Sequence, residues 1–293
     1  MRTEQEMMKV ILGVAERDER IRAVYLNGSR ANPGAPKDIF QDFDIVYVVT
    51  ETEGFIKDKS WIKVFGEIVV MQEPDVNVLY DSEATDQKTR YAYLMQFMDG
   101  NRIDLTLQTI EASIRECKKE KLTSILLDKD SILPKIPAPS DEDYRVIKPT
   151  QVKYEHCSNE FWWVAPYIAK GLWRGELLYA IDHMNFYVRP MLLMMLSWHA
   201  GILTNFSISV GKNCKYLNHY LPEKLWNKLL ATYSPAEPEK LWDALMAMGE
   251  LFRETAVFVG KEMGYEYNLG EDQRTMDFLK DIRKLPGDAK EIR

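Results

Sequence analysis

The sequence predicts a mixed α/β (α+β) N-terminal domain followed by an all-α C-terminal domain. Three observations support this prediction. Short apolar runs of strand length dominate the N-terminal half of the chain. A stretch rich in proline at 133–140 then interrupts the pattern. Beyond it, apolar residues recur at helical spacing. We therefore expect one domain at 1–146 and a second, helical domain at 147–293.

Local patterns justify the elements of the first domain in order. Met7, Ile11, Val14 and Ala15 recur at helical spacing and predict an amphipathic helix. Asp99-Gly100 stands between two alternating apolar runs, which is the strongest short signal for a β-hairpin. The expected elements are a helix at 4–16, strands at 21–27 and 43–49, a helix at 53–64, a strand at 66–72, a hairpin of 91–98 and 101–107, a helix near 111–120, and a short apolar run at 125–127.

The second domain is expected to contain helices only, because its apolar residues follow the helical period and no alternating runs appear. The expected helices lie at roughly 150–173, 176–200, 222–231, 238–260 and 272–284.

The composition excludes several classes of protein. Hydrophobic residues make up 46% of the chain and charged residues 28%, which is typical of a soluble globular protein. No window approaches the roughly 18 consecutive apolar residues of a membrane helix, and the polar N-terminus does not resemble a secretory signal. We expect a cytoplasmic protein with no membrane partner, as a monomer or a homodimer.

The charge and the cysteines narrow the chemistry further. A net charge of −7 argues against nucleic acid as the main partner, because binding to phosphate backbones needs a basic surface. The three cysteines are far apart, with no Cys-x-x-Cys motif, so neither a zinc site nor a disulfide framework is expected.

Two short motifs lie at the ends of the first two predicted strands. Gly28-Ser29 closes one strand, and Asp42 and Asp44 open the next. Because strand side chains alternate, the two aspartates point to the same face. Carboxylates on one face repel each other unless a cation lies between them, and Mg²⁺ takes carboxylate and phosphate oxygens. Glycine allows close approach of the backbone to a phosphate.

A third carboxylate is predicted on the hairpin. Asp104 alternates with Ile103 and Leu105, so it faces away from the core side of its strand. If this strand lies beside the one that bears Asp42 and Asp44, three carboxylates converge on one face, which fits a two-metal site for phosphoryl or nucleotidyl transfer. Asp104 is also the candidate general base.

Other interpretations of these motifs were weighed. Asp-x-Asp occurs by chance in many turns, and it also holds a metal in glycosyltransferases that use sugar nucleotides. The upstream Gly-Ser and the third aspartate favour nucleotidyl transfer. The sequence contains no Walker motif and no Gly-x-Gly-x-x-Gly.

The chain is similar along nearly its whole length to the aminoglycoside 6-adenylyltransferases, the streptomycin-modifying branch of the nucleotidyltransferase superfamily. The stretch at 76–90 fits the family pattern poorly. The segments that carry the resemblance include Gly28-Ser29-Arg30, Asp42-Phe43-Asp44, Asp99-Gly100-Asn101-Arg102-Ile103-Asp104, Asn159-Glu160-Phe161-Trp162 and Ala180-Ile181-Asp182-His183.

The resemblance implies a nucleotidyltransferase-type mixed sheet and transfer of AMP from ATP to the 6-hydroxyl of streptomycin, with two Mg²⁺ ions and a role in antibiotic resistance. ATP would bind between the glycine loop and the aspartates, with the antibiotic in the cleft between the domains. The implied site residues are Asp42, Asp44 and Asp104 for the metals and catalysis, and Gly28, Ser29 and Arg30 for the nucleotide. Lys212 and Lys215 follow the loop at 204–211 and are candidates to reach the triphosphate as point charges, although most surface lysines have no specific role.

The helical domain contains a candidate binding surface for the acceptor of the AMP group. A polar and aromatic stripe at helical spacing suits a polycationic sugar, although spacing alone favours a solvated surface, and the resemblance is what shifts the balance. The following helix repeats the theme with Tyr179, Phe186 and Arg189. The candidate acceptor-binding residues are Glu160, Trp163, Tyr167, Lys170 and Asp182.

Two alternatives stay open at this point. One is a nucleotidyltransferase that acts on another antibiotic, a metabolite or a protein. The other is a catalytically silent protein that binds a cationic ligand.

Overall fold

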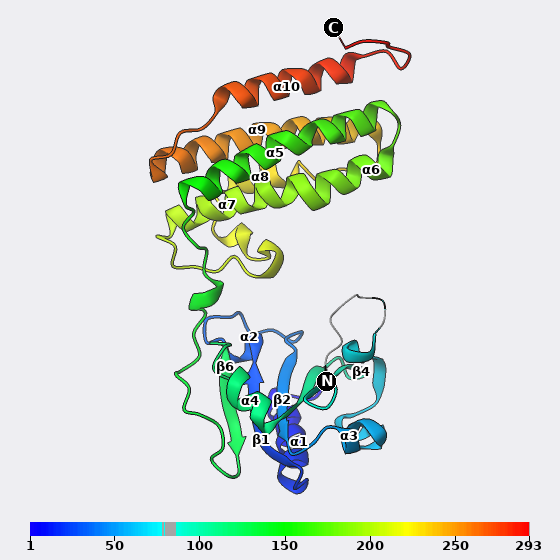
Figure 1. Cartoon of the computed structure of the whole chain (residues 1–293), viewed down its shortest axis with the longest axis vertical. Coiled ribbons are helices and arrows are strands. Elements are labelled where there is room, and N and C mark those ends of the chain that lie inside the picture. The colour runs from blue at the N-terminus through cyan, green and yellow to red at the C-terminus, as the bar shows by residue number, and fades with distance from the viewer. Residues whose placement is uncertain (78, 80–85, 293) are drawn as a thin grey trace. The chain divides into compact units, whose positions relative to one another are not determined.

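The computed structural model describes residues 1–77, 79 and 86–292. The chain divides into two compact units, Met1–Asp143 and Tyr144–Arg293, which are described separately below (Figure 1). The fold class expected from the sequence is confirmed, with a mixed sheet in the first unit and helices in the second. In the part of the chain that the structure describes, no helix has the length and apolar character needed to cross a membrane.

The first unit is built on a sheet of six described strands in the order β3-β4-β5-β2-β1-β6. β2 and β5 pair in parallel, and every other neighbouring pair is antiparallel. This single parallel pairing brings together two strands that are distant in the sequence. The strands are β1 (Ile21–Asn27), β2 (Phe43–Val49), β3 (Ile68–Gln72), β4 (Arg90–Phe97), β5 (Arg102–Thr109) and β6 (Thr123–Asp128).

One face of the sheet is covered and forms the main core of this unit. Phe43, Ile45 and Tyr47 of β2 are fully buried there. They pack in one cluster with buried residues of α1 (Glu4–Arg17), including Met7 and Ile11. The opposite face is covered only in part, by a smaller cluster. The polar side chains of β2 and β5 point to this second face.

The segment 53–64 is two short helices rather than the one predicted helix. α3 (Glu53–Lys57) ends at Asp58, and a 3₁₀-helix, η1 (Lys59–Phe65), begins directly after it. Asp58 has an extended backbone, and its carboxylate accepts a hydrogen bond from the amide of Ser60. A short side chain that bonds to its own backbone competes with the helix and divides it.

The strands expected at 21–27 and 43–49 are present with those ends, and the remaining elements of the first unit are present with shifted ends. The hairpin of β4 and β5 is confirmed, with Gly100 at φ +87° in its turn. The predicted helix near 111–120 is the shorter α4 (Ile110–Glu116), and the apolar run at 125–127 lies within β6.

The second unit consists of helices, as predicted, around the long central helix α5 (Gln151–Trp173). α5 packs against α6, α7, α9 and α10, and its Phe161 stacks on Phe252 of α9 at 3.9 Å between ring centroids. The predicted helix at 176–200 is in three parts, with a π-helical segment in the middle. The elements are α6 (Leu177–Asp182), η4 (His183–Val188), α7 (Arg189–Leu203), α8 (Glu223–Leu230), α9 (Pro238–Met263) and α10 (Leu269–Lys284).

Candidate active site

The parallel pairing of β2 with β5 places two aspartates side by side. Asp44 and Asp104 are register partners in the ladder, and their neighbours Ile45 and Leu105 are buried on the opposite face. Asp42 immediately precedes β2, two residues from Asp44. This is the strand arrangement that the sequence-based hypothesis of a three-carboxylate site requires.

The pKa of the Asp44 carboxyl group is shifted well above its ordinary value. Burial is the main cause, and it raises the pKa of Asp44 to about 6. The charges of Asp104 and Asp42 act in the same direction, whereas Arg102 and Arg30 oppose the rise. A carboxyl group held near its point of ionisation by burial and like charges is typical of a functional site.

Gly28 lies against the carboxylate of Asp44. A Cβ atom at position 28 would be 2.2 Å from Oδ2 of Asp44, and the backbone of Gly28 has φ +71°. Both features exclude a side chain, so glycine is required at this position. Ser29 follows it in α2 (Gly28–Ala31) and is partly buried.

Arg30 supports the loop before β2 rather than presenting a free cation. Its guanidinium donates hydrogen bonds to the carbonyls of Gln41 and Asp42 at 2.8 and 3.0 Å. It also forms an ion pair with Glu4 at 3.2 Å and lies 3.8 Å from the centroid of the Phe43 ring. Its side chain is 8% exposed. In this structure Arg30 therefore positions the backbone of Asp42, and its contact with the nucleotide stays a prediction.

Arg102 is a site residue that the sequence reasoning did not single out. Its Nε and Nη2 atoms donate to the two carboxylate oxygens of Asp104 at 2.7 and 2.9 Å. Its Nε is also 3.7 Å from Oδ2 of Asp42. The available signal was the spacing Arg-x-Asp at the start of a strand, which puts both side chains on one face.

The aspartates fit a hard divalent cation by their chemistry, because carboxylate oxygens are the ligands that Mg²⁺ prefers. Across residues 1–77, 79 and 86–292, no group of three or more His, Cys, Asp or Glu side chains stands ready to hold a metal ion. Both oxygens of Asp104 accept hydrogen bonds from Arg102.

A pocket of about 550 Å³ lies along the same face of the sheet as the aspartates. Val46 and Thr106 line it, each two residues beyond Asp44 and Asp104 on their strands. Its volume is within the range of small-molecule sites. Its other lining residues include Tyr25, Asn27, Arg90, Gln108, Arg115, Lys119 and Thr123.

Three of the predicted acceptor-binding residues meet at one pocket of the helical unit. Trp163, Tyr167 and Lys170 line a pocket of about 210 Å³ on α5, and Lys170 Nζ is 4.8 Å from the centroid of the Tyr167 ring. Trp163 is 65% exposed. Glu160 and Asp182 are exposed, and neither is among the described residues that line this pocket.

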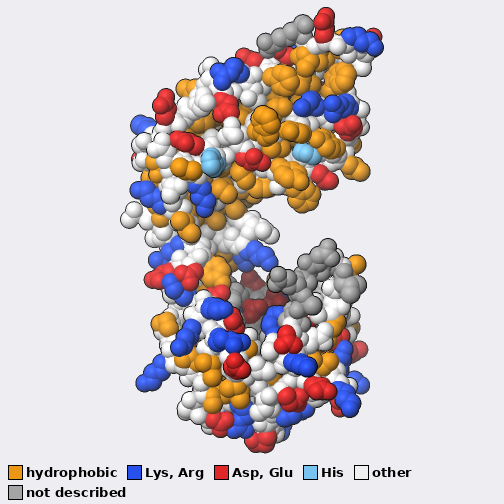
Figure 2. Space-filling model, viewed as in Figure 1, with side chains coloured by type: hydrophobic (Ala, Val, Ile, Leu, Met, Phe, Trp, Pro, Cys, Tyr) orange, Lys and Arg blue, Asp and Glu red, His pale blue; other side chains and the backbone are white. Residues whose placement is uncertain are grey.

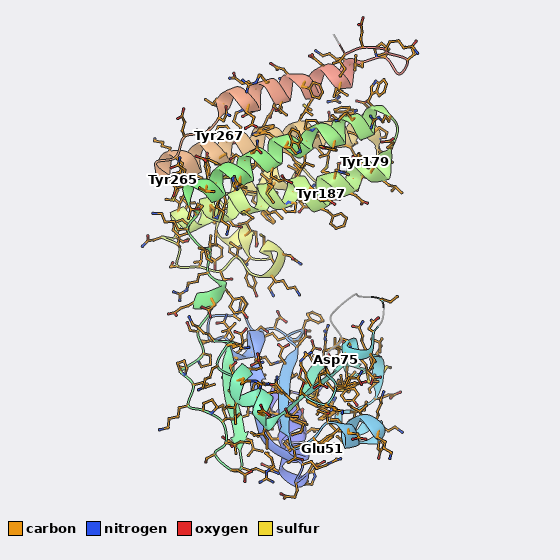
Figure 3. All side chains as sticks on the ribbon, viewed as in Figure 1. Glu51, Asp75, Tyr179, Tyr187, Tyr265 and Tyr267 are labelled. Carbon is orange, nitrogen blue, oxygen red and sulfur yellow. The ribbon has the colours of Figure 1, made fainter. Side chains whose placement is uncertain are left out.

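Aromatic rings extend this surface onto α6 and η4. His183 stacks on Tyr167 with 5.7 Å between ring centroids, and it also contacts Tyr179 and Tyr187. Figure 3 labels these last two tyrosines, and Figure 2 shows hydrophobic side chains gathered on this face of the helical unit. Tyr187 was not predicted, because the π-helical segment changes which residues share a face.

Arg189 does not belong to this surface, which corrects the expectation from helical spacing. It is buried, and it donates to the hydroxyl and the carbonyl of Thr232 at 2.6 and 2.9 Å. The helical spacing of the sequence predicts where Arg189 lies along the helix, but it does not show that the segment after α8 packs over its side chain.

Lys212 and Lys215 belong to the second unit, whereas the stretch 76–90 belongs to the first. Lys212 and Lys215 are exposed in the second unit, where Lys215 Nζ is 4.9 Å from the centroid of the Tyr216 ring. Of the stretch 76–90, residues 78 and 80–85 lie outside the described residues.

Comparison with known proteins identifies close relatives. A family model described as streptomycin adenylyltransferase matches residues 1–282. An aminoglycoside 6-adenylyltransferase from Campylobacter jejuni is 41% identical, with 97% of each chain covered. Another from Bacillus subtilis (strain 168) is 42% identical over 91% of this chain and 93% of its own. A solved structure of an aminoglycoside 6-adenyltransferase from Bacillus subtilis is 36% identical, covering 97% of this chain and 100% of that chain, with a TM-score of 0.49.

Proposed function

The chain belongs to the streptomycin adenylyltransferase family of nucleotidyltransferase enzymes, and from this premise we propose that it transfers AMP from ATP to the 6-hydroxyl of streptomycin. The acceptor oxygen attacks the α-phosphorus, the bond from that phosphorus to the bridging oxygen breaks, and pyrophosphate leaves. The observation that carries the proposal is the in-register pair Asp44 and Asp104, with Gly28 packed against Asp44.

The three aspartates are assigned to metal binding, and one of them also to proton transfer. We assign Asp42, Asp44 and Asp104 as ligands of two Mg²⁺ ions, which would neutralise the triphosphate and align it for in-line attack. Asp104 also accepts the proton of the acceptor hydroxyl, because one carboxylate has two oxygens and can serve a metal and a hydroxyl together. Arg30 holds the backbone of Asp42 in place through its hydrogen bonds.

The glycine loop and the adjoining pocket suit the nucleotide. Gly28 lets a phosphate approach the backbone closely, and Ser29 supplies a hydroxyl beside it. We assign the pocket of about 550 Å³ to the nucleoside part of ATP, because Val46 and Thr106, two residues beyond Asp44 and Asp104, line it together with polar groups such as Gln108. Lys212 and Lys215 of the second unit are assigned to the triphosphate as point charges.

The aromatic surface of the helical unit is assigned to the aminoglycoside. Trp163 and Tyr167 offer flat faces on which a sugar ring stacks, and Glu160 and Asp182 offer charge-assisted hydrogen bonds to cationic groups. Lys170 contributes hydroxyl contacts from the same pocket. Modification would add a charged, bulky group to the drug and so confer resistance in the cytoplasm.

Mass spectrometry of streptomycin after incubation with the protein, ATP and Mg²⁺ tests the proposal. We expect a product heavier by one adenylyl group, formed only when ATP and Mg²⁺ are both present. Binding of streptomycin without any product would indicate a silent binder. Product from another acceptor in a panel with labelled ATP, but none from streptomycin, would support a nucleotidyltransferase of different specificity.

A further inference from the structure

Four charged side chains lie on one face at the start of β2 and β5. Asp44 is the register partner of Asp104, and Phe43 is the partner of Ile103, so Asp42 and Arg102 are neighbours one step earlier in the ladder. The face therefore carries three carboxylates and one guanidinium within a single pair of strands.

Arg102 already makes the contacts to this cluster that a metal ion would otherwise make. It binds both oxygens of Asp104, at 2.7 and 2.9 Å, and it lies 3.7 Å from Asp42. Such a bidentate, charge-assisted pair is among the stronger hydrogen-bonded interactions in proteins. A divalent ion that binds Asp104 must therefore compete with a cation that belongs to the chain.

Arg102 and a divalent ion differ in charge, and this difference affects how each of them binds to the carboxylates. The single positive charge of Arg102 is smaller than the combined negative charge of the three carboxylates, and its contacts are with Asp104 at 2.7 and 2.9 Å and with Asp42 at 3.7 Å. The cluster thus remains attractive to a cation of higher charge, while Arg102 limits the repulsion when none is bound. The Arg102 side chain is 41% exposed, so it can leave the carboxylates without opening the core.

We propose that Arg102 is an internal counter-cation, which pairs with Asp104 and Asp42 in the metal-free enzyme and is displaced from Asp104 when a divalent ion binds. The proposal rests on the metal-dependent function given above. Metal alone binds weakly because it must displace Arg102, whereas metal that arrives with ATP brings triphosphate oxygens that offset this cost. Metal and nucleotide then bind with positive coupling.

The test compares Arg102→Gln with a matched control, Arg22→Gln. Arg22 also makes a bidentate pair, with both distances to Asp130 at 2.6 Å, at the junction of β1 with the segment after β6. Mn²⁺ is titrated into each protein without nucleotide, and the free ion is measured by electron paramagnetic resonance. We expect Arg102→Gln to bind Mn²⁺ roughly 10- to 100-fold more tightly than the unmodified protein, the range expected for loss of a charge-assisted pair. Arg22→Gln should leave Mn²⁺ affinity unchanged.

A second variant, Arg102→Lys, keeps the inference testable if Arg102→Gln fails to fold. Arg102→Lys keeps the charge but cannot form the bidentate pair, so it should shift the affinity in the same direction by a smaller factor. Equal or weaker Mn²⁺ binding by both Arg102 variants would overturn the inference. Failure of the proposed function is recognised separately, because the unmodified protein would then form no adenylated aminoglycoside.

Discussion

Replacing Asp44 with Asn tests two effects of this carboxylate separately: how much its charge lowers the free energy of unfolding, and whether AMP transfer needs it. The pKa of Asp44 is about 6, against an ordinary value of 3.8. Between these values the folded protein keeps a proton that the unfolded chain has lost, so the free energy of unfolding falls as the pH rises through this window. Two pKa units correspond to about 3 kcal/mol, and partial exposure to solvent reduces this to about 1–3 kcal/mol.

The Asp44→Asn substitution should therefore stabilise the metal-free protein at pH 8, and the gain should disappear by pH 4. Chemical denaturation in the presence of a chelator measures it at both values. Asp58→Asn is the matched control, because hydrogen bonds from Ser60 lower the pKa of Asp58 and the same chemical change should give no gain at pH 8. In the same variant of Asp44, AMP transfer should be abolished, and Mg²⁺ with ATP should no longer raise the melting temperature.

Two results would refute this reasoning. A variant that is less stable than the unmodified protein at pH 8 would show that the charge of Asp44 is better compensated than its burial indicates. AMP transfer at a near-normal rate would remove Asp44 from the metal site.

Three further predictions concern the rest of the site. Gly28→Ala should lower the free energy of unfolding by about 1–3 kcal/mol and impair AMP transfer, because position 28 has a positive φ and lies against Asp44. Gly264→Ala is the control, since position 264 has φ +74° with open space around it; it should strain the backbone but leave AMP transfer intact. Equal transfer rates in the two variants would contradict the argument that Gly28 is needed for close approach. Asp104→Asn should lower kcat by roughly 10²–10⁴ at saturating Mg²⁺ in steady-state kinetics, and an unchanged kcat would exclude the role as base. Glu160→Ala or Asp182→Ala should raise the KM for streptomycin far more than the KM for ATP, since a charge-assisted hydrogen bond contributes roughly 1.5–3 kcal/mol; an unchanged KM for streptomycin in both variants would return these residues to the solvated surface.

Much of the arrangement of the three aspartates could be predicted, because its signals in the sequence are local. Alternation along a strand is enough to place Asp42 with Asp44, and Asp104 opposite Ile103, without knowledge of any partner strand. The pairing of β2 with β5 joins distant parts of the chain, so the sequence predicts the three-carboxylate site only on the condition that these two strands lie side by side. The structure meets that condition with the register Asp44 to Asp104.

The roles of the arginines could not be predicted in the same way. Arg30 stands beside the Gly-Ser motif, and its buried side chain donates hydrogen bonds to the carbonyls of residues 41 and 42, which the motif alone does not indicate. Arg189 has the spacing of a surface residue, yet a neighbouring segment covers it. In both cases the deciding contact comes from a part of the chain that periodicity does not describe.

The register of β5 ties the chemistry of the site to the core beneath it. Ile103, Leu105 and Leu107 are buried on one face, and Asp104 is directed to the other only because these three are held in place. Insertion or deletion of one residue within β5 would exchange the two faces and send a carboxylate into the apolar layer. Selection that preserves this enzyme's activity therefore also acts on aliphatic residues that never meet a substrate, and a transplanted site would need both strands in full rather than the aspartates alone.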